Sequence, residues 1–451
     1  MQYQNSPEKY SENHPENRAA AYQKGRRKSR GIFPIVAVLT AAGSIVGIFS
    51  LILSLADSIG GAPTPISTIS GGDDRNIGEE RPALTLEPGG STLSASVTSP
   101  VSLPLSAVLG NHSAPVMSIL APEIINLSAA RSPNASPIVT GSQDNTVRIW
   151  SADRNADARP PRTLTHNSAV NDVALVPPQI EADGLRLVTG SGSGEIKLWD
   201  FESGKLITTI ADDVGRILSV AASVDGRYFA SGSSNGSIKV WPVETIAAQK
   251  SQTNLRGQAL KAIGPAVSAI AFHPTNPNWL ISGDAEGTLH IWDIEREQIT
   301  LTFASSPVPT SASSPDAASD AGLEAQSNTT ITSLSLSPDG RYVASAMADT
   351  IQIWDIQTGR LTQTLSGHNA QVSDLAFSPD GIVLASSSHN QTVKTWNWAS
   401  GTVFCTLDDE AGAIHSVAFA EGGDTLISGN EDGTVRSWDL GKDSNRACLG
   451  R

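Results

Sequence analysis

The stretch ISGNEDGTVRSWD, residues 427–439, combines two strand patterns with a turn signal. A short segment of small and apolar residues leads into Asp432-Gly433, and an alternating segment ending in Trp438-Asp439 follows. Alternation with a period of two is typical of a β-strand, and Asp-Gly favours a tight turn because glycine accepts a positive φ. The stretch therefore predicts a β-hairpin.

The ending of this hairpin recurs along the chain, where a tryptophan closes a short alternating segment. The seven occurrences are centred on Trp150, Trp199, Trp241, Trp292, Trp354, Trp396 and Trp438. Three of the six intervals between them are 42 residues, and the others are 49, 51 and 62 residues. A repeat of about 42 residues with insertions indicates tandem supersecondary units.

Each unit contains further strand and turn signals ahead of the hairpin. Alternating segments such as VSAIAFHP (267–274) and VSDLAFSPDG (372–381) precede the small-residue strand, and another alternating segment follows the tryptophan. Four short strands per unit are expected, so the fold class is all-β. With 39 Gly and 26 Pro in 451 residues, a helical bundle is excluded.

On these motifs the chain resembles the WD-repeat family over residues 103–442. The resemblance implies a seven-bladed β-propeller in which residues 105–109 supply the outer strand of the last blade. It also implies a structural polar network of histidine, a strand hydroxyl, a turn acid and tryptophan, for which His112 with Asp144 and His368 with Asn390 are the nearest matches. Because the family uses such sets structurally, catalysis by them is not expected.

The first hundred residues differ from the repeats. Residues 1–30 are predicted to be a disordered, basic cytoplasmic tail, and residues 31–56 contain no charged residue or histidine. A helix over residues 35–56 would be about 33 Å long at ~1.5 Å per residue, against a hydrocarbon core of about 30 Å. We therefore expect one transmembrane signal-anchor helix, a Pro/Ser/Gly-rich linker over residues 57–102, and a C-terminal tail over residues 443–451.

The charge around the apolar run predicts its orientation. Five basic residues lie between positions 24 and 30, and the next Lys or Arg after the run is Arg75. The positive-inside rule then places the N-terminus in the cytoplasm and the propeller on the non-cytoplasmic side. A cleaved signal peptide and a buried core helix are the alternatives. The spacing of Gly43 and Gly47 is compatible with a homodimer.

Several classes of chemistry are not expected. The formal net charge of −14 argues against nucleic-acid binding. The histidines have no metal-ligand spacing, and Gly232–Gly236 matches GxSxG but lies where a hairpin turn is predicted. No cofactor, metal or catalytic residue is predicted. Cys405 and Cys448 could form a disulfide outside the cytoplasm, and the sequence leaves this open.

Acidic residues cluster in loops that a propeller would bring to one face. They form a candidate partner-binding rim composed of Asp212, Asp213, Asp349, Asp408, Asp409, Glu410, Glu431 and Asp432. The alternative is that turns simply favour Asp. The insertion at 303–328 is either a partner-binding loop or a neutral solvated one.

The combined prediction is a membrane-anchored, non-enzymatic protein–protein interaction scaffold that resembles membrane-anchored WD-repeat proteins of bacteria. The alternative is a ligand-sensing propeller that signals through its transmembrane helix.

Overall fold

The computed structural model describes eleven segments of the chain, all after residue 100. They are 101–103, 107–121, 137–150, 160–179, 184–211, 215–248, 257–260, 265–304, 329–409, 412–442 and 445–450. No helix in these segments is long and apolar enough to cross a bilayer. The predicted tail and transmembrane helix, including Gly43 and Gly47, lie outside the described residues, as do residues 57–100 of the predicted linker and the loop at 305–328. The last two residues of the predicted linker, 101 and 102, belong to a short strand.

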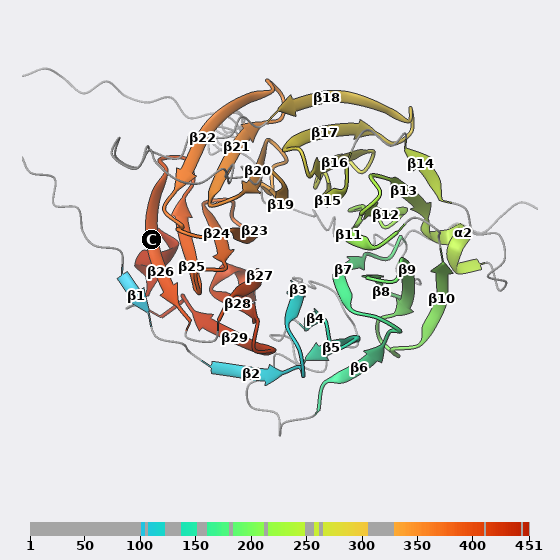
Figure 1. Cartoon of the computed structure of the whole chain (residues 1–451), viewed down its shortest axis with the longest axis horizontal. Helices are drawn as coiled ribbons and strands as arrows, with labels where there is room; N and C mark the ends of the chain where they lie inside the picture. The colour runs from blue at the N-terminus through green and yellow to red at the C-terminus, as the bar shows by residue number, and fades with distance from the viewer. Residues whose placement is uncertain are drawn as a thin grey trace, which may run out of the picture. The chain divides into compact units, whose positions relative to one another are not determined.

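Seven sheets stand around a central channel as the blades of a propeller, which confirms the predicted all-β, seven-bladed fold (Figure 1). In blades 1 to 6 the four main strands are hydrogen-bonded in chain order, from the inner strand at the channel to the outer strand.

The first three blades are as follows. Blade 1 contains β3 (Val116–Leu120), β4 (Ile138–Ser142), β5 (Thr146–Trp150) and β6 (Arg162–Thr165). Blade 2 contains β7 (Val170–Val176), β8 (Arg186–Ser191), β9 (Glu195–Asp200) and β10 (Leu206–Ala211). Blade 3 contains β11 (Ile217–Ala222), β12 (Tyr228–Ser233), β13 (Ile238–Pro242) and β14 (Gln258–Leu260), with helix α2 (Val243–Ala248) after β13.

The next three blades continue the ring. Blade 4 contains β15 (Val267–Phe272), β16 (Trp279–Asp284), β17 (Thr288–Asp293) and β18 (Gln298–Ala304). Blade 5 contains β19 (Ile331–Leu336), β20 (Tyr342–Met347), β21 (Thr350–Asp355) and β22 (Arg360–Ser366). Blade 6 contains β23 (Val372–Phe377), β24 (Val383–Ser388), β25 (Thr392–Asn397) and β26 (Thr402–Asp408).

Blade 7 closes the ring with strands from both sides of the repeat region. It contains β27 (Ile414–Ala420), the 3-10 turn η2 (Glu421–Gly423), β28 (Thr425–Asn430) and β29 (Thr434–Asp439). Its outer strand is β2 (Ala107–Asn111), which pairs antiparallel with β29. The predicted closure by an N-terminal strand is therefore present, two residues later than expected.

Two further segments lie against blade 6. Strand β1 (Val101–Leu103) pairs in parallel with β26 as a fifth strand. The 3-10 turn η3 (Arg446–Leu449) follows blade 7 and contacts β26.

The hydrophobic core consists of clusters between neighbouring blades. In one cluster, Val147 and Leu164 of blade 1 pack with Val173 and Trp199 of blade 2. The small residues of the second strands make room for this packing. At Gly190 a Cβ atom would lie 2.5 Å from Cγ2 of Ile217 in the next blade, so a side chain there would push the blades apart.

Candidate functional site

Every repeat tryptophan is tied to its own blade by the same hydrogen bond. The indole Nε1 donates to a hydroxyl on the second strand at 2.8–3.3 Å. The pairs are Trp150–Thr140, Trp199–Thr189, Trp241–Ser231, Trp292–Ser282, Trp354–Ser345, Trp396–Ser386 and Trp438–Ser428. A buried indole N–H needs such an acceptor, so the motif carries a structural requirement.

The network of blade 1 extends this bond to a histidine and an acid. His112 contacts Thr140 Oγ1 through Nε2 at 2.7 Å and Asp144 Oδ2 through Nδ1 at 2.9 Å. The side chains of His112 and Asp144 are 0% and 4% exposed. Burial lowers the pKa of His112 despite the neighbouring carboxylate, and hydrogen bonds from Thr146 and His112 outweigh burial in lowering the pKa of Asp144. Both side chains are therefore largely buried and bonded within the protein.

Blades 6 and 2 contain weaker versions of this set. In blade 6, His368 contacts Ser386 at 2.7 Å and Asn390 Nδ2 at 3.4 Å, and burial lowers the pKa of His368 to about 4. In blade 2, His166 contacts Thr189 at 2.7 Å, and burial lowers its pKa to about 3. The turn of blade 2 offers no acid to His166, whose Nδ1 has no partner.

In blade 7 an aspartate paired with an arginine replaces the histidine, whereas the turn keeps its acid, Asp432, six residues before Trp438. The backbone N–H of Asp409 donates to Gln391 O, just as that of His112 donates to Gly433 O, so Asp409 occupies the histidine position. Arg436 donates to Asp409 and lies 3.3 Å from Asp432. Asp409 is 2% exposed. This corrects the prediction for Asp409, which belongs to a buried ion pair rather than to an exposed rim.

The four remaining rim candidates that the structure describes lie on one face of the propeller. We call it the rim face, because it carries the hairpin turns between the second and third strands. Asp408, Glu431 and Asp432 are exposed on it, and Asp349 is half-buried. Asp212, Asp213 and Glu410 lie outside the described residues. The rim face role of these acids stays a prediction.

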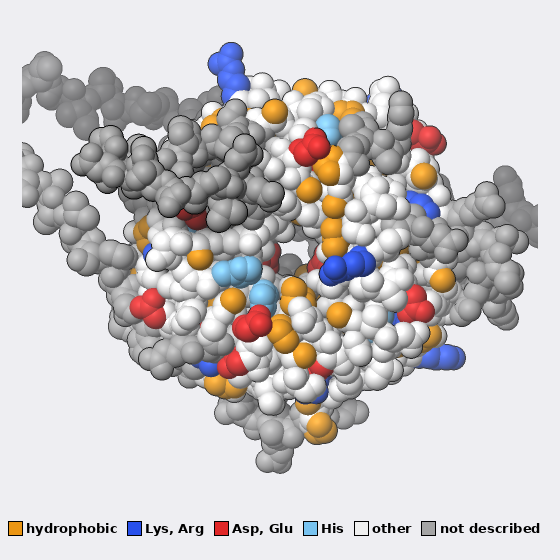
Figure 2. Space-filling view, in the orientation of Figure 1, with side chains coloured by type: hydrophobic (Ala, Val, Ile, Leu, Met, Phe, Trp, Pro, Cys, Tyr) orange, Lys and Arg blue, Asp and Glu red, His pale blue; other side chains and the backbone are white. Residues whose placement is uncertain are grey.

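Two histidines lie on the rim face near Glu431, and one of them, His415, also lines the channel. His415, the second residue of β27, pairs with Glu431, and its ring lies edge-on to that of His389 with centroids 5.4 Å apart. Figure 2 shows histidine and acidic side chains gathered beside the central opening. The sequence pattern did not single out these histidines, since neither belongs to a repeat network.

The channel itself is lined by polar side chains that link neighbouring blades. It has a volume of about 340 Å³, with lining residues from all seven inner strands. The third residue of each inner strand forms the inner belt, which consists of Ser118, Asp172, Ser219, Ser333, Asp374 and Ser416, with Ala269 in blade 4. Each inner strand has a β-bulge just before this residue.

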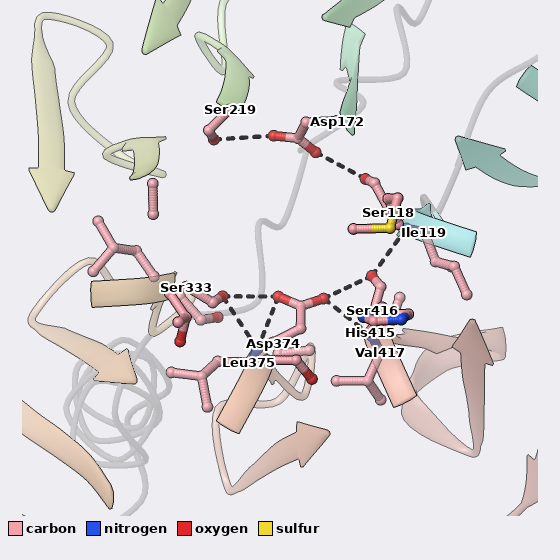
Figure 3. Close-up of a pocket in the computed structure, with 18 of the residues that line it drawn as sticks. Ser118, Ile119, Asp172, Ser219, Ser333, Asp374, Leu375, His415, Ser416 and Val417 are labelled. Carbon is pink, nitrogen blue, oxygen red and sulfur yellow. Dashed lines mark hydrogen bonds between the residues drawn. The ribbon is translucent and has the colours of Figure 1, made fainter. Parts of the chain in front are cut away.

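The inner belt bridges six of the seven boundaries between the described blades, and Figure 3 shows part of it. The belt side chain accepts a hydrogen bond from the backbone N–H of the next inner strand at 2.8–3.3 Å. The two carboxylates also accept from belt hydroxyls on either side, as Asp172 does from Ser118 and Ser219. Burial raises the pKa of Asp172 to about 6 and raises that of Asp374 as well. These carboxylates hold blades together.

The inner belt was not predicted, although the sequence contains a signal for it. Ser or Asp follows the first apolar residue of the inner strand by two positions in six units. In a strand with one solvated face, the alternating pattern does not distinguish such a residue from an ordinary polar residue that faces the channel.

Two further sequence predictions concern a metal site and the GxSxG match in the described part of the chain. It contains no group of three or more His, Cys, Asp or Glu side chains placed to hold a metal ion. Gly232–Gly236 lies at the turn between β12 and β13 rather than between a strand and a helix.

Comparison with known proteins identifies the family. The WD40 family, described as "WD domain, G-beta repeat", matches seven segments, at 104–151, 158–200, 204–242, 254–293, 321–355, 359–397 and 401–439. The chain belongs to the WD-repeat family. Each match ends at or next to the Trp-containing ending of one unit.

This WD-repeat chain is similar to several curated proteins. It is 23% identical over 286 residues to the guanine nucleotide-binding protein subunit beta of Saccharomyces cerevisiae, covering 59% of this chain and 66% of that protein. It is 25% identical over 229 residues to a periodic tryptophan protein 2 homolog of Dictyostelium discoideum, covering 50% and 17%. It is 24% identical over 267 residues to the target of rapamycin complex subunit LST8 of Mus musculus, covering 56% and 70%. The chain thus spans less than two thirds of the first two relatives.

Proposed function

We propose that this WD-repeat protein is a non-enzymatic scaffold that binds a protein partner on its rim face. The observation that carries the proposal is the contrast between the two kinds of polar residue. The histidine and acid sets that resemble catalytic groups are buried and bonded within the blades, whereas Glu431, Asp408 and the half-buried His415 lie at the surface. Rigid blades hold these residues at fixed positions, as a binding surface requires.

The chemistry of the rim face indicates the kind of partner. Exposed carboxylates attract a basic segment and favour its encounter through long-range electrostatics. Two of the similar proteins are named as subunits of larger assemblies, which supports a role in protein association.

We further propose that the propeller is exported and anchored, as in a membrane-anchored bacterial-type member of the family. The uncharged run at 31–56 behind a basic cluster supports an uncleaved anchor with a cytoplasmic N-terminus. The bond between Cys405 and Cys448 supports the same topology, because disulfides persist in oxidising compartments. The Gly43 and Gly47 spacing supports pairing of two such helices.

Charge reversal on the rim face tests the binding site. The variant Asp408→Lys/Glu431→Lys is compared with Glu202→Lys/Glu295→Lys, which makes the same charge change at exposed turns after the third strands of blades 2 and 4, on the opposite face. The wild-type protein is first crosslinked to its partners in intact cells, and these partners are identified by mass spectrometry. Capture of the same partners is then measured for both variants.

The proposal predicts that the rim variant loses those partners while the control variant keeps them, with unchanged circular dichroism for both. Equal capture by both variants would place the binding surface elsewhere. Turnover of a substrate by the purified wild-type chain would contradict a non-enzymatic role.

A further inference from the structure

A covalent link spans the boundary between blades 6 and 7. Cys405 on β26 is bonded to Cys448 in η3, with the Cα atoms 5.0 Å apart and a sequence separation of 43. Strands β27, β28 and β29 all lie within the loop that this bond closes. The loop closed by the disulfide therefore contains every strand of blade 7 except β2.

The C-terminal segment that carries Cys448 is seated in the core. Cys448 and Leu449 are 0% and 2% exposed, and they belong to the same hydrophobic cluster as Leu407 and Trp438. Asn445 also holds the C-terminal segment in place, because its Nδ2 donates a hydrogen bond to Asp439 O at 2.6 Å. This segment, residues 445–450, thus fills the outer part of the boundary between blades 6 and 7.

The N-terminal strands meet the same boundary. Strand β1 pairs in parallel with β26, and Val101 lies opposite Cys405 in the register. Strand β2 then completes blade 7 by pairing with β29. Blades 1 to 6 each take their four main strands from one continuous stretch of chain, so among the described blades only blade 7 depends on a non-covalent closure.

We propose that the Cys405–Cys448 bond is a thiol-controlled latch on blade 7. When oxidised, it holds the C-terminal segment in place and limits the separation of blade 7 from blade 6. A dithiol reductant releases it in a two-electron exchange. One reductant thiolate attacks a cystine sulfur, its second thiol resolves the mixed disulfide, and two protein thiols and one reductant disulfide result.

The burial of the latch couples its chemistry to motion. Cys405 and Cys448 are both fully buried, so a reductant reaches the sulfurs only when residues 445–450 lift from the core. The reduction rate therefore reports the opening of this segment. After reduction the segment is no longer tethered, and blade 7 with β2 opens more often than the other blades.

Hydrogen exchange of the full-length protein in detergent tests the latch, with dithiothreitol as the reductant. The chain has only two cysteines, so the reagent acts at one bond. Reduction is expected to speed exchange in peptides from β2 and β27–β29 at least about tenfold. Peptides from β11–β17 serve as the internal control and should change little. Equal change in both regions, or none in blade 7, overturns the proposal.

A second variant separates the latch from general instability. Leu449→Ala keeps both cysteines but weakens the seating of the C-terminal segment, so dithiothreitol should reduce it at least about tenfold faster than wild type. The exposed substitution Val224→Ala is its control, with a wild-type rate expected. An unchanged rate in Leu449→Ala contradicts the coupling. Two free thiols in protein alkylated within its native compartment also overturn the proposal.

Discussion

The imidazole of His166 contacts Thr189 Oγ1 at 2.7 Å through Nε2, while its buried Nδ1 has no hydrogen-bond partner. In blade 1 the corresponding nitrogen of His112 is bound by Asp144, which precedes Trp150 by six residues. Ser193 precedes Trp199 by the same number. Blade 2 therefore has the histidine of the network without its acid.

Ser193→Asp should supply the missing acceptor. A carboxylate at this turn can accept from His166 Nδ1, so we expect the free energy of unfolding to rise by about 1 kcal/mol, as is usual for one buried hydrogen bond. Chemical denaturation measures the change. Asn235→Asp, at the same turn position in blade 3, is the control and should change stability by less than about 0.5 kcal/mol. An unchanged free energy of unfolding in Ser193→Asp, with a circular dichroism spectrum like that of wild type, would refute the assigned role of the missing acid.

Ala269→Ser should complete the inner belt. Ala269 occupies the belt position in blade 4, where the belt side chains of six other blades accept a backbone N–H from the next blade. A serine there can accept from Leu334, so stability should rise by about 0.5–1.5 kcal/mol. Exposed Ala399→Ser is the matched change without a belt contact. Thermal unfolding measures the stability of both variants. A loss of stability in Ala269→Ser would contradict the proposed hydrogen bond between blades 4 and 5.

Asp172 makes stability depend on pH in an unusual direction. Its pKa rises from 3.8 to about 6 because burial penalises the carboxylate. Since the native state then holds the proton more tightly than the unfolded state, the contribution of Asp172 to stability falls as pH rises from about 4 to about 6. At 1.36 kcal/mol per unit, the loss approaches about 3 kcal/mol.

Denaturation of wild type and Asp172→Asn from pH 4 to pH 7 isolates this contribution. The stability of wild type relative to the variant should decrease over that range. Asp355→Asn is the opposing control, because a hydrogen bond from the backbone of Thr358 leads the interactions that lower the pKa of Asp355. The stability of wild type relative to Asp355→Asn should increase as pH rises through the acidic range. A difference independent of pH for Asp172→Asn would disprove its assigned role.

Gly340 and His273 should be coupled across blades 4 and 5. Gly340 has φ +74°, and a Cβ there would lie 2.2 Å from His273 Cε1, while Gly340 O contacts His273 Nε2 at 2.8 Å. Gly340→Ala is expected to cost about 2–4 kcal/mol from strain and overlap. Adding His273→Ala should remove the overlap, so the double variant should be more stable than the sum of the single effects. Additive losses in a double-mutant cycle would deny the coupling.

The repeat and its ring closure could be predicted from the sequence because each depends on local patterns. The tryptophan endings, the turn residues and the alternating strands recur in phase, and the N-terminal strand of blade 7 follows from the offset between sequence unit and blade. His112 and Asp144 could be matched because blade 1 keeps the full set of residues.

Other features depend on residues that meet only in space. Arg436 joins Asp409 in blade 7 because an arginine on one strand reaches the position that a histidine fills elsewhere, and no spacing rule indicates this exchange. The inner belt depends on the bulge in each inner strand, which turns Asp172 toward the next blade. The bond between Cys405 and Cys448 was left open, since it required the C-terminal segment to return to blade 6.

The proposed partner class depends on export of the propeller, because only an exported rim face meets non-cytoplasmic proteins. To test export, protease is added to sealed cells or vesicles of known orientation, and cleavage of a C-terminal tag is followed. We predict that the tag is cleaved while the cytoplasmic compartment stays intact, as a cytoplasmic marker confirms. A tag that is protected until the cytoplasmic compartment is opened would contradict the account.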